Sequence, residues 1–373
     1  MTRVVIAVLV LVLGVSAPAA ADDVVDGRLG PGALYRLVRP TNWNGRLVVY
    51  AHGYVTRTEP VALPAEADLL IGLLVPQGFA VAYSSYSENG WAVKDGAQRT
   101  HQMIGAFTAR FGVPSRVYLG GASMGGLVAI KLVEQHAVAF DGVVAACAIA
   151  GGTRQQYDYL ANVRALFDAI YPGVLPGNAG AVSLGTDIPT AIVLPALLAM
   201  QASPDGAFAI AAIDQTPVPF ANAAELGESI ATALGGHALS FVDLVPELHG
   251  KKYFDNRDVQ YTGALPPGVL AAINATVDRF VASPSALNYM AQYYEPSGDL
   301  EIPMLMLSTS RDPVVPGFHQ ESYVNRVAAA GQSDWLVQRT VDRYGHCNFT
   351  PAELAAAFTD LVAWVEFGIK PAP

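Results

Sequence analysis

The chain has 373 residues, of which 52% are hydrophobic and 14% are charged, and its formal net charge is −10. This composition excludes an intrinsically disordered chain, because enough apolar surface is present to form a large core. Lysine and arginine do not cluster anywhere in the sequence, and we therefore expect no nucleic-acid partner.

The first 21 residues have the pattern of a secretory signal peptide. A short basic start, Met1–Arg3, precedes the apolar run Val4–Leu13, and the small residues Ala19–Ala21 form a cleavage site. The alternative is a permanent anchor, but the apolar run is shorter than the ~20 residues that span a membrane. We therefore expect cleavage near Ala21, secretion to the periplasm or the medium, and a mature protein without a stable membrane anchor.

From residue 22 onwards, strand-like and helix-like segments alternate. Such alternation is typical of an α/β protein with a mostly parallel central sheet and helices on both faces. Strands are predicted at 33–39, 46–51, 79–84, 117–122 and 142–150, and helices at 62–75, 93–111 and 124–136.

The alternation stops at residue 152 and resumes near residue 300. In between, short helical patches are predicted at 157–170, 190–201, 221–234 and 268–282, and afterwards strands at 302–309 and 336–341 with helices at 317–330 and 351–367. We interpret residues 152–300 as a large helical cap inserted into one α/β domain, whose two parts are 22–151 and 301–373. A separate second domain is the alternative, and the return of the α/β pattern argues against it.

Ser123 lies in a Gly-x-Ser-x-Gly element, flanked at two positions on either side by Gly121 and Gly125. A nucleophilic serine on a sharp strand-to-helix turn needs small residues at these positions, because larger ones collide with the turn. A predicted strand leads into the element and a predicted helix leads out of it. This context favours a nucleophile over an incidental serine in a glycine-rich turn.

A serine hydroxyl needs a general base, and the base needs an acid that orients it. In a parallel sheet, functional residues gather in the loops that leave the carboxyl ends of the strands. Asp312 follows the predicted strand 302–309, and His346 follows the last predicted strand. We therefore predict Ser123 as the nucleophile, His346 as the base and Asp312 as the acid, with Asp334 and Asp342 as less well placed alternatives to Asp312.

With serine, aspartate and histidine in this chain order, the sequence resembles the α/β-hydrolase superfamily. The resemblance covers residues 33–151 and 300–368 and implies the α/β-hydrolase fold. It also implies an oxyanion hole, in which the amide of Met124 is one donor. The second donor is the amide of Tyr54, which follows the dipeptide His52-Gly53, and the amide of Gly53 is the alternative second donor.

Two narrower resemblances are partial. The elbow Ser-Met-Gly-Gly is similar to that of cutinase-like and polyester hydrolases, although those enzymes have little or no cap. The dipeptide His346-Cys347 resembles the tannase and feruloyl-esterase family, in which a cysteine beside the histidine is disulfide-linked to one beside the nucleophile; here Ala122 precedes the serine. Cys147 lies at the same predicted sheet edge, so we predict a Cys147–Cys347 disulfide, with two free thiols as the alternative.

Other site predictions are less specific. The candidates for lining a substrate pocket are Gly53, Tyr86 and Trp91, together with Asn89. The alternative, which we weigh equally, is that the aromatic residues are ordinary loop residues with no role in binding. The sequence has no metal-ligand spacing, no Gly-x-Gly-x-x-Gly and no P-loop, and so we expect neither a metal nor another cofactor.

Together these features predict an exported serine hydrolase that cleaves small or oligomeric carboxylic esters through an acyl-enzyme. A serine peptidase or amidase of the same fold is the main alternative, since both reactions use the same intermediates. A non-catalytic binding protein on a hydrolase scaffold is the alternative from another class.

Overall fold

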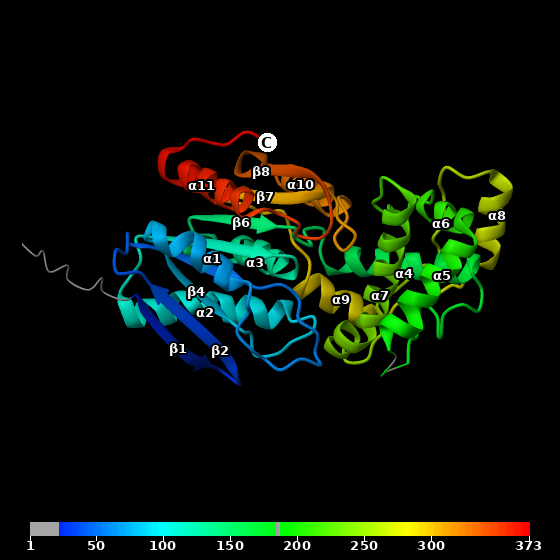
Figure 1. Cartoon of the computed structure of the whole chain (residues 1–373), viewed down its shortest axis with the longest axis horizontal. Coiled ribbons are helices and arrows are strands. Elements are labelled where there is room, and N and C mark those ends of the chain that lie inside the picture. Colours follow the sequence, from blue (N-terminus) through cyan, green and yellow to red (C-terminus); the bar gives the residue numbers. More distant parts are fainter. Residues whose placement is uncertain (1–21, 184, 186) are drawn as a thin grey trace, which may run out of the picture.

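The structure is a computed structural model that describes residues 22–183, 185 and 187–373. The predicted signal peptide, residues 1–21, therefore lies outside the described residues. Figure 1 shows two bodies side by side, one built on a central sheet and the other made of helices.

The sheet of the described chain has eight strands in the order β1-β2-β4-β3-β5-β6-β7-β8. β3 to β8 run parallel to one another, whereas β1 and β2 pair antiparallel and extend the β4 edge. The strands are β1 (Asp23–Leu29), β2 (Ala33–Arg39), β3 (Arg46–Ala51), β4 (Ala80–Ser84), β5 (Arg116–Ala122), β6 (Gly142–Ala146), β7 (Met304–Arg311) and β8 (Leu336–Tyr344).

Two strand predictions differ from the structure. β1 was not predicted, because this edge strand alternates exposed with partly buried residues and includes few apolar ones. The strand predicted at 142–150 ends at Ala146, since Cys147 has a φ of +43°, which extended backbone does not allow. Cys147 therefore lies in the loop that follows β6.

Helices cover both faces of the sheet. On one face, α1 (Ala67–Leu74) and α11 (Pro351–Phe367) pack over apolar side chains of β3, β4 and β5 such as Val48 and Tyr118. On the other face lie α2 (Val93–Phe111), α3 (Met124–Gln135) and α10 (Phe318–Ala329). Burial on both sides explains why the central strands read as continuous apolar runs.

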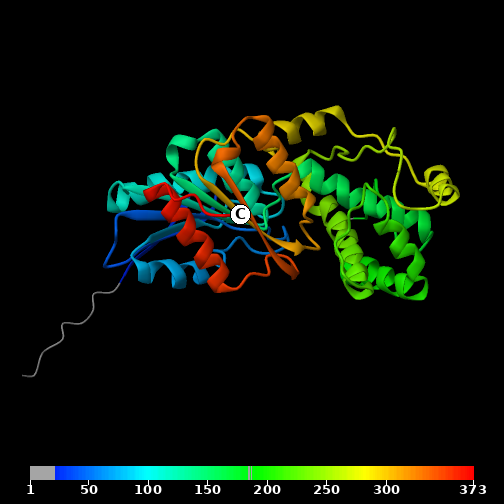
Figure 2. The same cartoon turned by 90° about the horizontal axis from the view of Figure 1, so that it is seen from above.

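The residues predicted as the cap contain the helices between β6 and β7. These are α4 (Thr153–Ile170), α5 (Leu194–Ala202), α6 (Pro204–Ala211), α7 (Ala223–Glu247), α8 (Pro267–Thr276) and α9 (Pro284–Tyr293). Figures 1 and 2 show α4 to α8 gathered at one end of the molecule and α9 running back towards the sheet. We keep the name cap for residues 152–300.

Among the described residues, no single helix is both long and apolar enough to cross a membrane. One pair of cap helices, Pro189–Ala202 and Pro204–Ala211, reaches that length and composition only together, and the pair is bent by 106°.

Candidate active site

Ser123 sits on a strained turn between β5 and α3. Its φ of 57° and ψ of −123° lie outside the regions that ordinary residues adopt, as expected of a nucleophile elbow. The flanking glycines are needed for space. A Cβ on Gly121 would lie 2.2 Å from the carbonyl oxygen of Gly125, and one on Gly125 would lie 2.1 Å from that of Ala51. The backbone of the turn is therefore too tightly packed for any larger residue at either position.

The three residues predicted as a triad lie in one hydrogen-bonded series. His346 Nε2 is 2.9 Å from Ser123 Oγ, and His346 Nδ1 is 2.8 Å from Asp312 Oδ2. Asp312 is 1% exposed, and its Oδ1 accepts the backbone N–H groups of Val314 and Val315, both at 2.9 Å. These amides hold the carboxylate in one orientation, so its second oxygen faces the imidazole. Such an arrangement can deprotonate the serine when it attacks a carbonyl.

The histidine loop is joined to the end of β6 through sulfur. Cys147 and Cys347 are disulfide-bonded, with Cα atoms 5.3 Å apart and 200 positions apart in the chain. The loop also has a hydrogen bond from Thr309 Oγ1 to the carbonyl oxygen of Gly345, at 2.7 Å. The link and this bond restrain the backbone on both sides of His346.

The two cysteines and His346 form the one group of potential metal ligands found in the described part of the chain. A metal needs thiolate or neutral imidazole ligands with free lone pairs. Here the two sulfur atoms are bonded to each other, and both imidazole nitrogens face the triad partners. The group therefore lacks the free lone pairs that a metal centre needs.

The predicted oxyanion donors lie beside the nucleophile. Met124 is the first residue of α3, so its N–H is one of the amides that a helix leaves without an internal partner. Across from it, Gly53 lies against the elbow: a Cβ there would meet Ser123 Cβ and the Ala122 carbonyl oxygen, each at 3.5 Å. The loop that carries Gly53 and Tyr54 is thus close enough to present an amide to a tetrahedral intermediate on the serine.

Tyr86, which the sequence offers as a candidate for lining the pocket or as an ordinary loop aromatic, is not among the residues that line the cavity and supports this loop instead. It is fully buried, its ring stacks on His52 at 3.7 Å between centroids, and its hydroxyl donates to the His52 carbonyl oxygen at 3.0 Å. Burial lowers the pKa of His52 and so favours its neutral imidazole. Asn89 is likewise used internally, because its Nδ2 donates to the Glu59 carbonyl oxygen at 2.8 Å.

The cap directly contacts the loop that carries Gly53 and Tyr54. The hydroxyl of Tyr54 donates to Asp243 Oδ2, and the Arg57 N–H reaches Asp243 Oδ1 at 3.3 Å. Asp243 belongs to α7, as does Glu247, which forms an ion pair with the Arg57 guanidinium. Burial raises the pKa of the Asp243 carboxyl and that of the Tyr54 hydroxyl. Sequence reasoning missed Asp243, because nothing local marks a residue that meets a loop 189 positions away.

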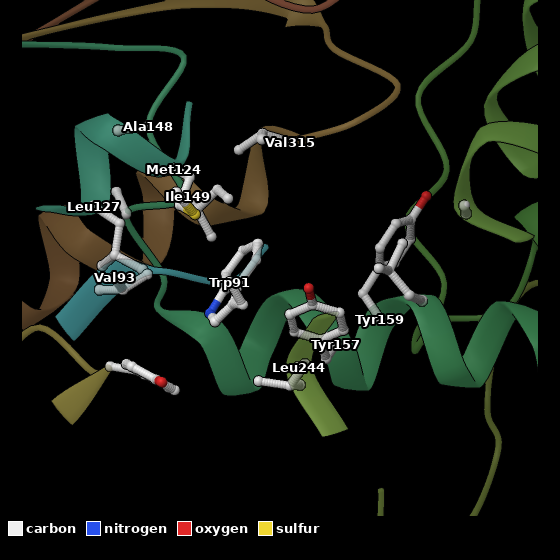
Figure 3. Packing of buried hydrophobic residues seen from close by; sticks show 14 of the residues in the cluster. Trp91, Val93, Met124, Leu127, Ala148, Ile149, Tyr157, Tyr159, Leu244 and Val315 are labelled. Carbon is white, nitrogen blue, oxygen red and sulfur yellow. The ribbon is translucent and has the colours of Figure 1, made fainter. Parts of the chain in front are cut away.

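A cavity of about 540 Å³ opens onto Ser123, within the ~300–1,000 Å³ range of ligand sites. Trp91 and Gly53 line it, as predicted from the sequence, and so does Tyr157 of α4. Figure 3 shows Trp91 beside Tyr157. Their ring centroids are 4.8 Å apart, and the indole N–H donates to Thr153 Oγ1 at 2.8 Å, which joins the α/β domain to the cap at the pocket wall.

No protein-family model matches the sequence, and no curated protein matches it. Among solved structures, an esterase of Pyrococcus furiosus is 13% identical with a TM-score of 0.46, covering 94% of this chain and 95% of that one. Lipase A of Candida antarctica in its closed state is 14% identical with a TM-score of 0.48, over 91% and 75%. A proline iminopeptidase of Mycobacterium smegmatis is 12% identical with a TM-score of 0.47, over 93% and 99%.

These likenesses are too weak to support an argument about activity. The fold is identified by the molecule itself. The strained turn of Ser123 follows β5, in the middle of the parallel strands, and Asp312 and His346 follow β7 and β8, which is the arrangement typical of this fold. The chain has the α/β-hydrolase fold.

Proposed function

We propose that the protein is an exported serine hydrolase that cleaves carboxylic esters through an acyl-enzyme intermediate. The observation that carries this proposal is the hydrogen-bonded series Ser123–His346–Asp312, set on a strained elbow at the wall of a cavity. A serine without a catalytic role is not expected to combine unfavourable backbone angles with a hydrogen bond to an imidazole that is itself bonded to a buried carboxylate.

The proposed reaction begins when Ser123 Oγ attacks the ester carbonyl and His346 Nε2 takes the hydroxyl proton. The negative charge on the carbonyl oxygen is stabilised by the amides of Met124 and Tyr54. The C–O bond then breaks, and the imidazolium returns the proton to the leaving alcohol. Water attacks the acyl-enzyme by the same route, with His346 again as the base, and releases the carboxylic acid and the free serine.

The character of the cavity favours an ester over a peptide with a free amino terminus. An aminopeptidase needs carboxylates beside the nucleophile to bind the ammonium group. Of the described residues that line the cavity, Glu66 is the only one with a carboxylate, and it is exposed at the start of α1. The wall around Ser123 consists mainly of aromatic and aliphatic side chains, which suit an uncharged substrate.

Export is supported by two features. The N-terminal segment has the signal-peptide pattern, and the cysteine pair suits an oxidising compartment, where disulfides persist. We expect the protein recovered from the periplasm or the medium to begin at Asp22. An intact Met1 in the exported protein, or retention in the cytoplasm, would contradict this part of the proposal.

The catalytic proposal is tested by labelling with a fluorophosphonate. Wild type should be labelled, Ser123→Ala should not, and Ser115→Ala, which changes an exposed serine outside the cavity, should be labelled like wild type. Hydrolysis of p-nitrophenyl esters should exceed that of aminoacyl-p-nitroanilides. Absence of labelling in wild type would favour a binding protein, and faster cleavage of the anilides would favour a peptidase.

A further inference from the structure

The residues that line the cavity at Ser123 fall into two groups, and we treat the space beside each group as one arm of the cavity. One arm, which we call the cap arm, is lined by Trp91 and by cap residues such as Tyr157, Leu160 and Leu239. The other, which we call the α1–α11 arm, lies over the sheet between those two helices. Its walls are Leu69, Leu70 and Leu73 of α1 and Leu354 and Phe358 of α11, with Phe349 before that helix. Ser123, at the carboxyl end of the sheet, lines the same cavity as both arms.

The α1–α11 arm exists because the sheet beneath it carries small side chains. Gly120 and Ala122 of β5 alternate onto this face and pair with Val144 and Ala146 of β6. Central strands of a parallel sheet are normally buried on both faces. Here Gly120, Ala122 and Val144 are nevertheless partly exposed, because no side chain from α1 or α11 fills the space above them.

Gly120 shows most directly that this space is open. A Cβ there would have only Tyr50 Cδ2 within 4 Å, at 3.8 Å, which is an ordinary contact. The backbone of Gly120 does not adopt a positive φ, unlike that of many other glycines in the chain, so its conformation does not require glycine. What the glycine provides at this position is room.

The walls of the arm select for chemistry as well as shape. The two helical walls consist mainly of leucine and phenylalanine side chains. The polar groups that line this side are the Tyr50 hydroxyl, Glu66 just before α1 and Gln77 in the turn that follows it. Neither lysine nor arginine is among the described residues that line the cavity. The arm therefore offers no ion-pair partner to a carboxylate or a phosphate, and it favours an uncharged aliphatic chain.

We infer that the α1–α11 arm binds an unbranched aliphatic chain of the ester, so the enzyme prefers long-chain to short-chain substrates. This inference rests on the proposed function, since it places the ester carbonyl at Ser123, where the two arms meet. The chain lies either on the acyl side or on the alcohol side of the carbonyl, and the remaining group of the ester occupies the cap arm.

The first experiment is a pair of chain-length series on wild type. One series is p-nitrophenyl acetate, octanoate and palmitate, and the other is ethyl, octyl and hexadecyl acetate. We expect kcat/KM to rise in one series, by up to about fourfold per methylene until the arm is filled. The series that rises shows whether the chain is acyl or alkoxy. Flat profiles in both series would overturn the inference.

The second experiment fills the arm from its floor. Gly120→Val should lower the ratio of kcat/KM for the longest ester to that for the shortest by at least about tenfold. Val144→Phe, a second substitution on the same floor, should do the same and serves if Gly120→Val does not fold. Gly105→Val is the matched control: it changes an exposed glycine of α2 that has no heavy atom within 4 Å of its would-be Cβ, and the ratio should stay as in wild type.

The inference would be overturned if Gly120→Val and Val144→Phe both kept the wild-type ratio of kcat/KM for the longest ester to that for the shortest. That failure is distinct from failure of the proposed function. If the arm is not the chain site, wild type still reacts with the fluorophosphonate and still hydrolyses acetate esters. If the protein is not a serine hydrolase, neither reaction occurs.

Discussion

Replacing Asp312 by asparagine should abolish most of the activity without unfolding the protein, and the geometry says why. Asp312 Oδ1 accepts two backbone N–H groups, from Val314 and Val315, so the carbonyl oxygen of the asparagine amide must take that position. Its NH₂ group then faces His346 Nδ1. Nδ1 has to accept a hydrogen bond, and the ring proton moves to Nε2.

A proton on Nε2 faces Ser123 Oγ, which lies 2.9 Å away. In that tautomer the imidazole cannot take the serine proton, so the first step loses its base. We expect Asp312→Asn to lower kcat/KM by about 10⁴-fold, equivalent to about 5 kcal/mol of transition-state stabilisation. The melting temperature should change little, because both hydrogen bonds to the backbone persist.

The assay is steady-state hydrolysis of a p-nitrophenyl ester, with thermal unfolding measured by circular dichroism on the same samples. Asp342→Asn is the matched control, because the Asp342 side chain is 87% exposed and bonds to Ser310 and Arg311 on the surface. That variant should keep activity within about twofold of wild type, as surface ion pairs contribute little. More than a tenth of wild-type activity in Asp312→Asn, or an equal loss in the control, would refute the reasoning.

Three further predictions concern stability. Replacing Cys147 and Cys347 together by alanine opens a loop of 200 positions and should lower the free energy of unfolding by up to about 5 kcal/mol, read from urea midpoints; an unchanged midpoint would contradict it. Burial raises the pKa of the Glu295 carboxyl from 4.5 to about 7, so the folded state binds the carboxyl proton more tightly than the unfolded chain does. The free energy of unfolding should therefore fall by up to roughly 3 kcal/mol as the pH rises from 4.5 to about 7. Glu295→Gln should flatten that fall in melts between pH 4.5 and 7.5, and a slope equal to that of wild type would count against it. Gly125→Ala should destabilise by about 3 kcal/mol or more through contact with backbone, whereas Gly120→Ala should be nearly neutral, and similar melting temperatures for the two would argue against the tight elbow.

The α/β architecture and the positions of Ser123, Asp312 and His346 were accessible from the sequence for one physical reason. Parallel strands place their carboxyl ends at one edge, so residues that follow different strands meet there even when they are far apart in the chain. Seven of the eight strands could be read from apolar runs and the turns between them. The edge strand β1 was missed because its side chains are largely exposed.

Features that depend on contact between the cap and the α/β domain could not be read in the same way. Asp243 lies in the last two turns of the amphipathic helix α7, and only the folded structure brings it to Tyr54. Tyr86 is of a residue type that often lines pockets, yet its hydroxyl donates a hydrogen bond to the His52 carbonyl oxygen. Gly120 belongs to the glycine-rich stretch before the nucleophile. The open space above it cannot be predicted from that stretch, because it depends on how helices from both ends of the chain pack over the sheet.

The Cys147–Cys347 link also has a consequence for damaged molecules. It makes the whole segment from the end of β6 to the histidine loop a closed covalent ring, and the cap lies within that ring. A single proteolytic cut in the cap produces one fragment that carries Ser123 and another that carries Asp312 and His346, but the two remain one molecule. Such a nicked protein migrates as an intact chain on a non-reducing gel and separates into two bands only after reduction, so cleavage of the cap can pass unnoticed while the reacting groups stay together.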